Sequence, residues 1–237
     1  MRKYFLVSNG ENELKYFFKK ITSRLKITYA IVNSKIFLLL SLPACRHIKI
    51  DRMMTKEKFQ GLRELILNHR FLMKSPLEIL EIGTWVGGSA ILFANSRPFF
   101  AERNKVTCLD LFNGTGVTLG KLRKRDQLIE REAIYNTLIK NIKKYSKLKY
   151  FTIFRGNSQN LVSEIPSNSR FDIFLIDGDH SYAGVKADFN NYQKFLKKGA
   201  LVIFDDCNME AFTNRTIKEK SGVANFIFNE VVFYKQL

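Results

Sequence analysis

Short apolar runs alternate with longer amphipathic segments between residues 77 and 207. The apolar runs are short and rich in Val, Ile, Leu and Phe, which predicts buried β-strands at 77–82, 105–110, 149–155, 172–177 and 200–205. The segments between them place apolar residues at helical spacing and predict helices near 87–95, 127–145 and 182–197. We expect Gly199 to end the last of these helices. The alternation is typical of βα units, so the sequence predicts an α/β fold with a mostly parallel sheet and helices on both faces.

The chain ahead of the first strand has a different character. A helix is expected near 55–70, with Thr55 as its cap. The sequence contains no internal repeat and no Pro-rich linker. We therefore expect one domain, residues 76–237, preceded by a basic N-terminal extension, residues 1–75, that is partly helical.

The net charge of +17 lies mainly outside the motif-bearing segments. Residues 1–75 hold 16 basic and 5 acidic groups, and residues 119–150 hold 10 and 3, whereas residues 151–237 hold 10 of each. Clustered Lys and Arg favour nucleic acid, anionic lipid or an anionic glycan as partners, but they also serve solubility alone. Both interpretations stay open at this point.

The cysteines and the apolar segments bear on location. Cys45, Cys108 and Cys207 have no CxxC spacing, which fits a reducing cytoplasm and argues against structural zinc. The apolar segment 36–45, "IFLLLSLPAC", is too short to span a bilayer, which takes roughly 20 residues. We interpret it as a buried element that docks the extension, with a membrane-surface element as the alternative. The expected location is the cytoplasm, with surface association to a membrane as an option.

The segment "LEILEIGTWVGGSAILFA", residues 77–94, predicts a ligand-binding turn between the first strand of the domain and its helix. Ligands of open parallel sheets bind beyond the carboxyl ends of the strands, and glycines let the backbone approach them closely. The spacing G-x-x-x-G-G of Gly83, Gly87 and Gly88 differs from the G-x-G-x-x-G of dinucleotide folds. Glu81 suits a ligand with an ammonium group or hydroxyls, such as S-adenosylmethionine. Asp110, which ends the second strand, suits the ribose of that ligand, with a strand-end cap as the alternative.

Five segments in this order resemble the class I S-adenosylmethionine-dependent methyltransferases, and within them the branch typified by macrolide-sugar O-methyltransferases. They are "LEIGTWVGGSA", "VTCLDLF", "FRGNSQNL", "FDIFLIDGDHSYAGVKADF" and "LKKGALVIFDD", and together they cover roughly residues 77–207. The resemblance implies the Rossmann-like methyltransferase fold. It also implies that Glu81, Gly83 and Gly87 line the methionine end of the cofactor, that Asp110 holds the ribose hydroxyls, and that Asn157 and Ser158 flank the adenine.

Four acids follow the fourth and fifth strands: Asp177, Asp179, Asp205 and Asp206. Adjacent parallel strands lie about 4.8 Å apart, so acids that end both can converge on one point. Converging carboxylates repel one another unless they share a proton or bind a cation, and oxygen ligands favour Mg²⁺, Ca²⁺ or Mn²⁺. In the resembling sugar methyltransferases the acids that match Asp177, Asp205 and Asp206 are associated with magnesium. We therefore predict a Mg²⁺ or Mn²⁺ site, with solvated or helix-capping acids as the alternative.

His180 directly follows the fourth strand, on the side where a substrate is expected. Its ordinary pKa near 6.5 lets it take a proton at neutral pH, so it is a candidate general base. Asp177 is the second candidate. A loop histidine bonded to a neighbouring Asp is the structural alternative.

The predicted activity is methyl transfer from S-adenosylmethionine to a hydroxyl of a sugar, glycan or related small molecule, assisted by a divalent ion (EC 2.1.1.-). A nucleic-acid methyltransferase acting on RNA is the first alternative, favoured by the basic charge. A non-catalytic binding protein that retains the methyltransferase fold is the second.

The chain has only 31 residues after Asp206, fewer than the helix and antiparallel strand pair with which the resembling family normally finishes. We expect the sheet to be short at this edge. The N-terminal extension would complete the edge, or a partner chain in a homo-oligomer would cover it.

Overall fold

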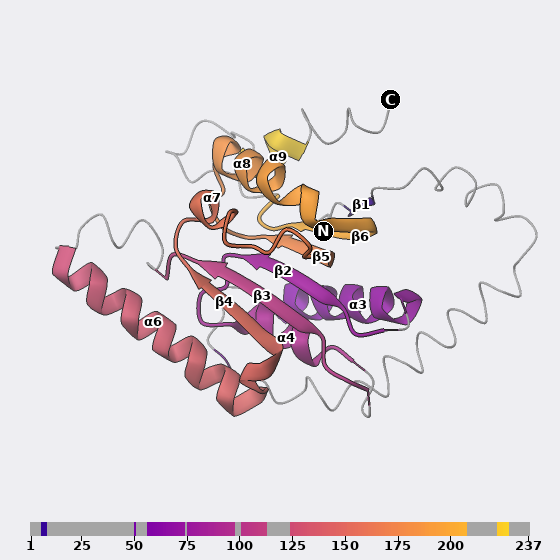
Figure 1. Ribbon diagram of the computed structural model, residues 1–237, viewed down its shortest axis with the longest axis horizontal. Helices are drawn as coiled ribbons and strands as arrows, with labels where there is room; N and C mark the ends of the chain where they lie inside the picture. Colours follow the sequence, from indigo (N-terminus) through magenta and orange to yellow (C-terminus); the bar gives the residue numbers. More distant parts are fainter. Residues whose placement is uncertain are drawn as a thin grey trace, which may run out of the picture.

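The computed structural model describes residues 6–8, 50, 56–73, 75–97, 101–112, 124–207 and 222–227. These residues form a six-stranded sheet with helices on both faces (Figure 1). The strand order is β1-β6-β5-β2-β3-β4, and every pair except β1–β6 is parallel. The parallel strands are β2 (Glu78–Ile82), β3 (Lys105–Asp110), β4 (Phe151–Arg155), β5 (Phe171–Ile176) and β6 (Leu196–Phe204).

The central strand β2 marks the point where the chain changes direction across the sheet. From β2 the chain runs outward to β3 and β4 on one side, and β5 and β6 lie on the other. The loops that leave β2 and β5 therefore face each other at the carboxyl end of the sheet. A doubly wound sheet binds its ligands at such a switch point.

Two helices pack on one face of the sheet, α3 (Lys56–Met73) and α4 (Gly88–Asn95). Side chains of α3 such as Leu62 and Ile66 join Ile79 and Ile173 of the sheet in a buried cluster. Every residue of α4 is buried, because the helix is almost entirely apolar and packs on the sheet against both α3 and the long helix α6 (Lys124–Tyr145).

The other face carries the short helices α7 (Ser158–Leu161), α8 (Tyr182–Tyr192) and α9 (Gly222–Phe226). Phe226 of α9 contacts the rings of Tyr182, Phe189 and Phe204, with ring centroids 5.6 to 6.1 Å apart. The C-terminal segment is thereby anchored in the core beside the loop that follows β5.

The predicted strands and helices are confirmed within a few residues, with one correction. The helix expected over 182–197 ends at Tyr192, is followed by a 3-10 turn, η3 (Gln193–Phe195), and does not reach Gly199. Gly199 lies inside β6, with φ +78°, where the pairing with β5 shifts register between Phe171 and Ile173. A glycine in the left-handed region is typical of a bulge, so Gly199 bends a strand and does not end a helix.

The expected short edge of the sheet is completed by the N-terminal extension. Strand β1 (Leu6–Ser8) pairs antiparallel with β6, with Leu6 opposite Ile203 and Ser8 opposite Leu201. This pairing satisfies main-chain groups that an edge strand would otherwise leave exposed.

Several sequence predictions lie outside the described residues. They concern the apolar segment 36–45, most of the basic residues of the N-terminal extension, the cap at Thr55, and the C-terminal segment apart from 222–227. Among the described helices, none has the length and apolar character that a membrane span requires.

Candidate functional site

The turn after β2 packs backbone against backbone at the carboxyl end of the sheet. The Gly83 N–H donates to the Leu109 carbonyl at 2.9 Å, and the Asp177 N–H donates to the Ile82 carbonyl at 2.9 Å. Gly83 has φ +92°, and a Cβ there would lie 1.9 Å from the carbonyl oxygen of Asp177. Only glycine fits this position, and its fit sets the spacing between the β2 turn and the loop that carries the acids.

Gly87 has a different structural role. It is the N-cap residue of α4 with φ +87°, and a Cβ there would lie 2.4 Å from Cδ1 of Leu138 on α6. Gly87 therefore lets α6 pack closely on the start of α4. Its contact with a cofactor stays a prediction.

Glu81 lies on β2 beneath this turn and is completely buried. Neither carboxyl oxygen has a hydrogen-bond partner among the described residues, and the buried Thr84 hydroxyl also lacks one. Burial raises the pKa of Glu81 to about 7, and the charge of Asp110 adds to this, while the nearby hydroxyls of Ser89 and Thr84 oppose it. An unpartnered buried carboxylate is costly, so this position favours a positively charged or hydrogen-bond-donating ligand group.

Asp110 ends β3 and holds the β2 turn from the neighbouring strand. Its carboxylate accepts the N–H of Trp85 at 2.6 Å and the N–H of Phe112 at 2.5 Å. Burial raises the pKa of Asp110, and these backbone donors oppose the rise. Asp110 thus caps the strand end, and the lone pairs that remain on its oxygens leave the predicted ribose contact open.

Backbone strain gathers at the same end of the sheet. Among the described residues, the non-glycine residues with positive φ are Trp85, Phe112 and Asp206, which follow β2, β3 and β6. Left-handed conformations cost energy outside glycine and cluster at functional sites. Neither Trp85 nor Phe112 was predicted from the sequence to belong to the site, since neither residue type indicates this conformation.

Asn157 and Ser158, the predicted adenine neighbours, begin helix α7. The Asn157 side chain accepts the N–H of Gln159 at 2.8 Å and so caps the helix. The Ser158 hydroxyl donates to Oδ1 of Asp188 at 2.6 Å, and the Tyr192 hydroxyl donates to the Ser158 carbonyl at 2.6 Å. Helix α8 therefore fixes the position of α7.

Asp188, which is 2% exposed, was not among the site residues predicted from the sequence. Burial raises its pKa to about 6, opposed by the Ser158 hydroxyl and reinforced by the charge of Asp179. A signal was available, because Asp188 shares a helical face with the apolar Val185, Phe189 and Tyr192.

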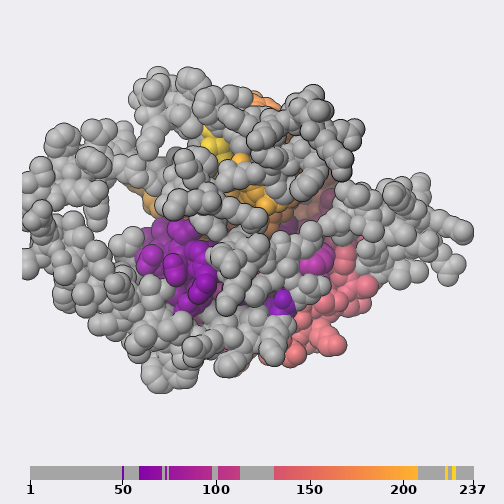
Figure 2. All heavy atoms as spheres, turned by 180° about the vertical axis from the view of Figure 1, so that it is seen from behind, coloured from indigo at the N-terminus to yellow at the C-terminus, as the bar shows by residue number. Residues whose placement is uncertain are grey.

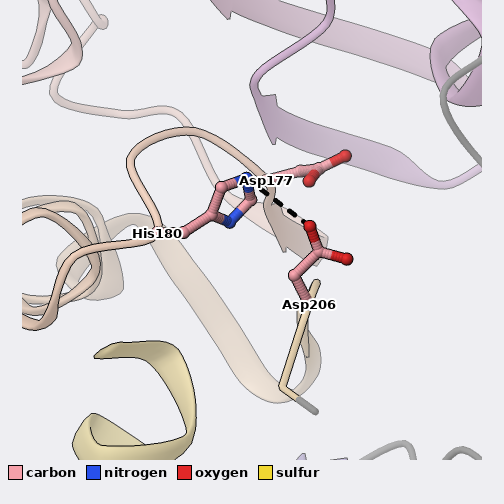
Figure 3. A group of neighbouring side chains, drawn as sticks. All are labelled: Asp177, His180 and Asp206. Carbon is pink, nitrogen blue, oxygen red and sulfur yellow. Dashed lines mark ion pairs between the residues drawn. The ribbon is translucent and has the colours of Figure 1, made fainter. Parts of the chain in front are cut away.

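Asp177, His180 and Asp206 come together beyond the ends of β5 and β6 (Figure 3). One potential ligand atom from each lies within 4.8 Å of the other two, and Nε2 of His180 lies 3.7 Å from Oδ2 of Asp206. All three residues are partly exposed. Two carboxylates and an imidazole at this spacing can accept a proton or bind a divalent ion.

The other two acids are directed elsewhere. Asp205, a predicted metal ligand, is buried, and its Oδ1 accepts the N–H of Asp206 at 2.7 Å. It therefore supports the left-handed backbone of Asp206 and is not part of the three-residue group. Asp179 is exposed and accepts the N–H of Ser181 at 2.9 Å.

A family model described as "Methyltransferase domain" matches residues 80–207, which is more than half of the chain. A curated relative, an uncharacterized protein of Acanthamoeba polyphaga mimivirus, is 28% identical over 137 residues. The match covers 56% of this chain and 52% of the viral protein, so the chain spans about half the length of that relative.

Solved structures with the same fold include the O-methyltransferase NovP, with a TM-score of 0.56 and 16% identity over 78% of this chain and 74% of NovP. TomG of Streptomyces achromogenes, an O-methyltransferase of tomaymycin synthesis solved with SAM, has a TM-score of 0.51 and 15% identity over 91% and 82% of the two chains. The O-methyltransferase of Bacillus cereus, solved with SAH, has a TM-score of 0.51 and 15% identity over 92% and 85%. At these identities the likeness establishes the fold. Together with the family match it shows that the chain belongs to the methyltransferase-domain family, in the Rossmann-like fold of the class I S-adenosylmethionine-dependent methyltransferases.

Proposed function

We propose that this protein transfers a methyl group from S-adenosylmethionine to a hydroxyl oxygen of a sugar, glycan or related small molecule. The observation that carries the proposal is the group of Asp177, His180 and Asp206, which lies beside the glycine turn at the switch point of a methyltransferase sheet. The TomG and Bacillus cereus structures, solved with SAM and SAH, support the cofactor assignment.

The residues around the glycine turn fit S-adenosylmethionine. Gly83 leaves the turn without a Cβ, and the buried Glu81 carboxylate lacks a partner that the ammonium group of the cofactor would supply. Asp110 would accept hydrogen bonds from the ribose, and the exposed Asn157 at the start of α7 would lie beside the adenine. When bound, the cofactor supplies the electrophilic methyl group.

The group of Asp177, His180 and Asp206 would prepare the acceptor hydroxyl. His180 would take the hydroxyl proton, and Asp206, 3.7 Å away, would stabilise the imidazolium that results. The same residues suit a divalent ion, which would lower the pKa of the hydroxyl. A set with one imidazole favours Mn²⁺ over Mg²⁺ among the two expected ions. Asp205 lies outside the three-residue group, so it would enter such a site only if its side chain moved toward these residues.

Two other functions are kept as alternatives, an RNA methyltransferase and a non-catalytic binding protein with this fold. Methyl transfer from labelled S-adenosylmethionine to a panel of sugars, glycans and RNA separates all three. Transfer to RNA alone would establish the first alternative, and cofactor binding without transfer to any acceptor would favour the second.

Isothermal titration is expected to show one site for S-adenosylmethionine or S-adenosylhomocysteine per chain. Asp110→Ala should weaken this binding about tenfold or more, because it removes both the predicted ribose contact and the acceptor that holds the Trp85 N–H. Glu132→Ala, which removes an exposed acid on α6, is the control. Binding of NAD with no response to either adenosyl ligand would refute the cofactor assignment.

Replacing Glu81 with glutamine is expected to change the pH dependence of stability. Because the folded state holds the proton up to about pH 7 and the unfolded chain releases it near pH 4.5, Glu81 makes stability fall as the pH rises through this interval. This rise in the pKa of Glu81 lowers the free energy of unfolding above pH 7 by about 3 kcal/mol. Glu81→Gln should remove this loss of stability. Urea unfolding of both proteins at pH 5 and pH 8 measures the difference.

The same variant tests the ammonium contact. Glu81→Gln should bind S-adenosylhomocysteine more weakly, and at pH 7 the wild-type protein should release protons on binding, which calorimetry in two buffers detects. A variant that binds the cofactor unchanged would show that Glu81 has only a structural role.

A further inference from the structure

The end of α6 forms a basic surface at the amino-terminal end of the sheet, opposite the candidate site. Segment 140–150 contains five lysines and no acidic residue, and all five lysines are exposed. Arg103 joins them, since its guanidinium carbon lies 5.6 Å from the ring centre of Tyr150. In Figure 1 this end of α6 leads into the start of β4. We call the following residues the basic end: Arg103, Lys140, Lys143, Lys144, Lys147 and Lys149.

The buried Asn95, at the end of α4, holds the basic end in place. Its Nδ2 donates to the Tyr145 carbonyl at 2.9 Å, and its Oδ1 accepts Nε of Arg103 at 2.9 Å and Oγ of Ser146 at 3.2 Å. The surface is therefore organised before any partner arrives. Two acidic residues are near the basic end among the described residues. Glu102 is exposed, and Oε1 of Glu78 lies 3.1 Å from Nζ of Lys105, with which it forms an ion pair.

Two tyrosines beside the basic end, Tyr145 and Tyr150, indicate which kind of partner it binds. Nζ of Lys144 lies 5.0 Å from the ring centre of Tyr145, and Nζ of Lys149 lies 5.1 Å from that of Tyr150. Single-stranded nucleic acid binds by stacking bases on free ring faces, and here the protein's own cations lie over these rings. The arrangement therefore disfavours a stacking platform for RNA.

The exposed Leu148 favours a lipid surface as the partner. It begins the 3-10 turn η2 (Leu148–Tyr150), three residues after the end of α6, is 40% exposed, and lies in the sequence between Lys147 and Lys149. Lysines attract anionic headgroups, while tyrosine and leucine side chains enter the boundary between headgroups and acyl chains. A leucine flanked by lysines and half-buried tyrosines combines both contacts.

We propose that the basic end docks this protein on the surface of an anionic phospholipid bilayer. The candidate site lies at the other end of strands that are five to nine residues long, so it faces away from the lipid. Docking and chemistry are therefore separable. The acceptor would be reached from the aqueous side.

The test is co-sedimentation of the full chain with vesicles of phosphatidylcholine containing about one third phosphatidylserine. We expect binding that weakens at high salt and is absent with phosphatidylcholine alone. Lys143→Gln with Lys147→Gln should lower the affinity about 25-fold, since each lysine near such a surface contributes about fivefold. The matched control, Lys194→Gln with Lys198→Gln, removes two exposed lysines near the start of β6, which is separated from β4 by three strands.

A second variant separates lipid from other polyanions. Leu148→Ser should weaken vesicle binding and leave its salt dependence unchanged, because it removes an apolar contact and no charge. Equal losses in the two lysine pairs, or unchanged binding in the Lys143 and Lys147 pair, would overturn the proposal. Binding to a single-stranded RNA oligonucleotide in preference to vesicles would overturn it in favour of nucleic acid.

Discussion

Asp206→Asn is expected to reduce kcat for methyl transfer about 10²- to 10⁴-fold, the range associated with general acid–base groups. Asp206 lies 3.7 Å from the imidazole of His180 and belongs to the group that would activate the acceptor hydroxyl. His180→Ala should cause a loss of similar size. Binding of S-adenosylhomocysteine should persist in both variants, because the proposed cofactor residues lie at or just after the ends of other strands, β2, β3 and β4.

Asp179→Asn is the matched control for this experiment. It makes the same chemical change in the neighbouring loop, which follows β5 and carries Asp177 and His180, but Asp179 is exposed and accepts the Ser181 N–H outside the group. The control should retain most of the activity. A loss in Asp179→Asn equal to that in Asp206→Asn would contradict the assignment of the group.

Chelation tests the metal separately. Treatment with EDTA should abolish methyl transfer and leave cofactor binding intact, and Mn²⁺ or Mg²⁺ should restore transfer. Asp205→Asn is informative here, because the amide keeps the oxygen that accepts the Asp206 N–H but loses the charge of a ligand. A raised metal requirement in Asp205→Asn would support the predicted set of Asp177, Asp205 and Asp206. Full activity in EDTA would refute the metal and leave His180 or Asp177 as the base.

Gly83→Ala is expected to lower the free energy of unfolding by about 2 to 5 kcal/mol and to abolish cofactor binding. The added methyl would lie 1.9 Å from the Asp177 carbonyl oxygen, and the residue would be held at φ +92°. Overpacking costs about 1 to 3 kcal/mol and the left-handed conformation about 1 to 2 kcal/mol. Relief of the overlap would move the β2 turn away from the loop that carries Asp177 and His180.

Gly199→Ala separates these two costs. Gly199 has φ +78°, and a Cβ there would have no atom within 4 Å, so this variant should show only the conformational cost. Urea unfolding gives the stability difference, and the shift of the melting temperature with S-adenosylhomocysteine reports binding. Gly83→Ala could instead be as stable as Gly199→Ala and show the same rise in melting temperature with S-adenosylhomocysteine. That result would show that the close approach of Gly83 to Asp177 is not needed for cofactor binding.

The sequence was sufficient for the parallel strands, the main helices and the family. For the strands and helices the reason is local, since short apolar runs such as 77–82 between amphipathic segments favour buried strands. The family was predicted from the resemblance of five segments to known methyltransferases. The acids were also placed correctly at the carboxyl ends of β5 and β6, because strand ends in a parallel sheet share one edge.

Details that depend on tertiary contacts could not be predicted from the sequence. Gly199 has the residue type of a helix stop, but the pairing of β6 with β5 made it a bulge. The burial of Asp188 and its hydrogen bond from Ser158 result from the packing of α8 on α7, so neither could be predicted from the sequence.

The candidate site shows the same division between sequence and structure. The sequence determined that two neighbouring strands end in acids and that a histidine follows one of them. The tertiary structure decided which of these side chains meet, because the left-handed backbone of Asp206 directs its carboxylate toward His180 while Asp205 turns to hold that backbone in place. Side-chain direction at a strand end depends on backbone dihedrals that neighbouring strands and loops impose, and residue type alone does not encode them.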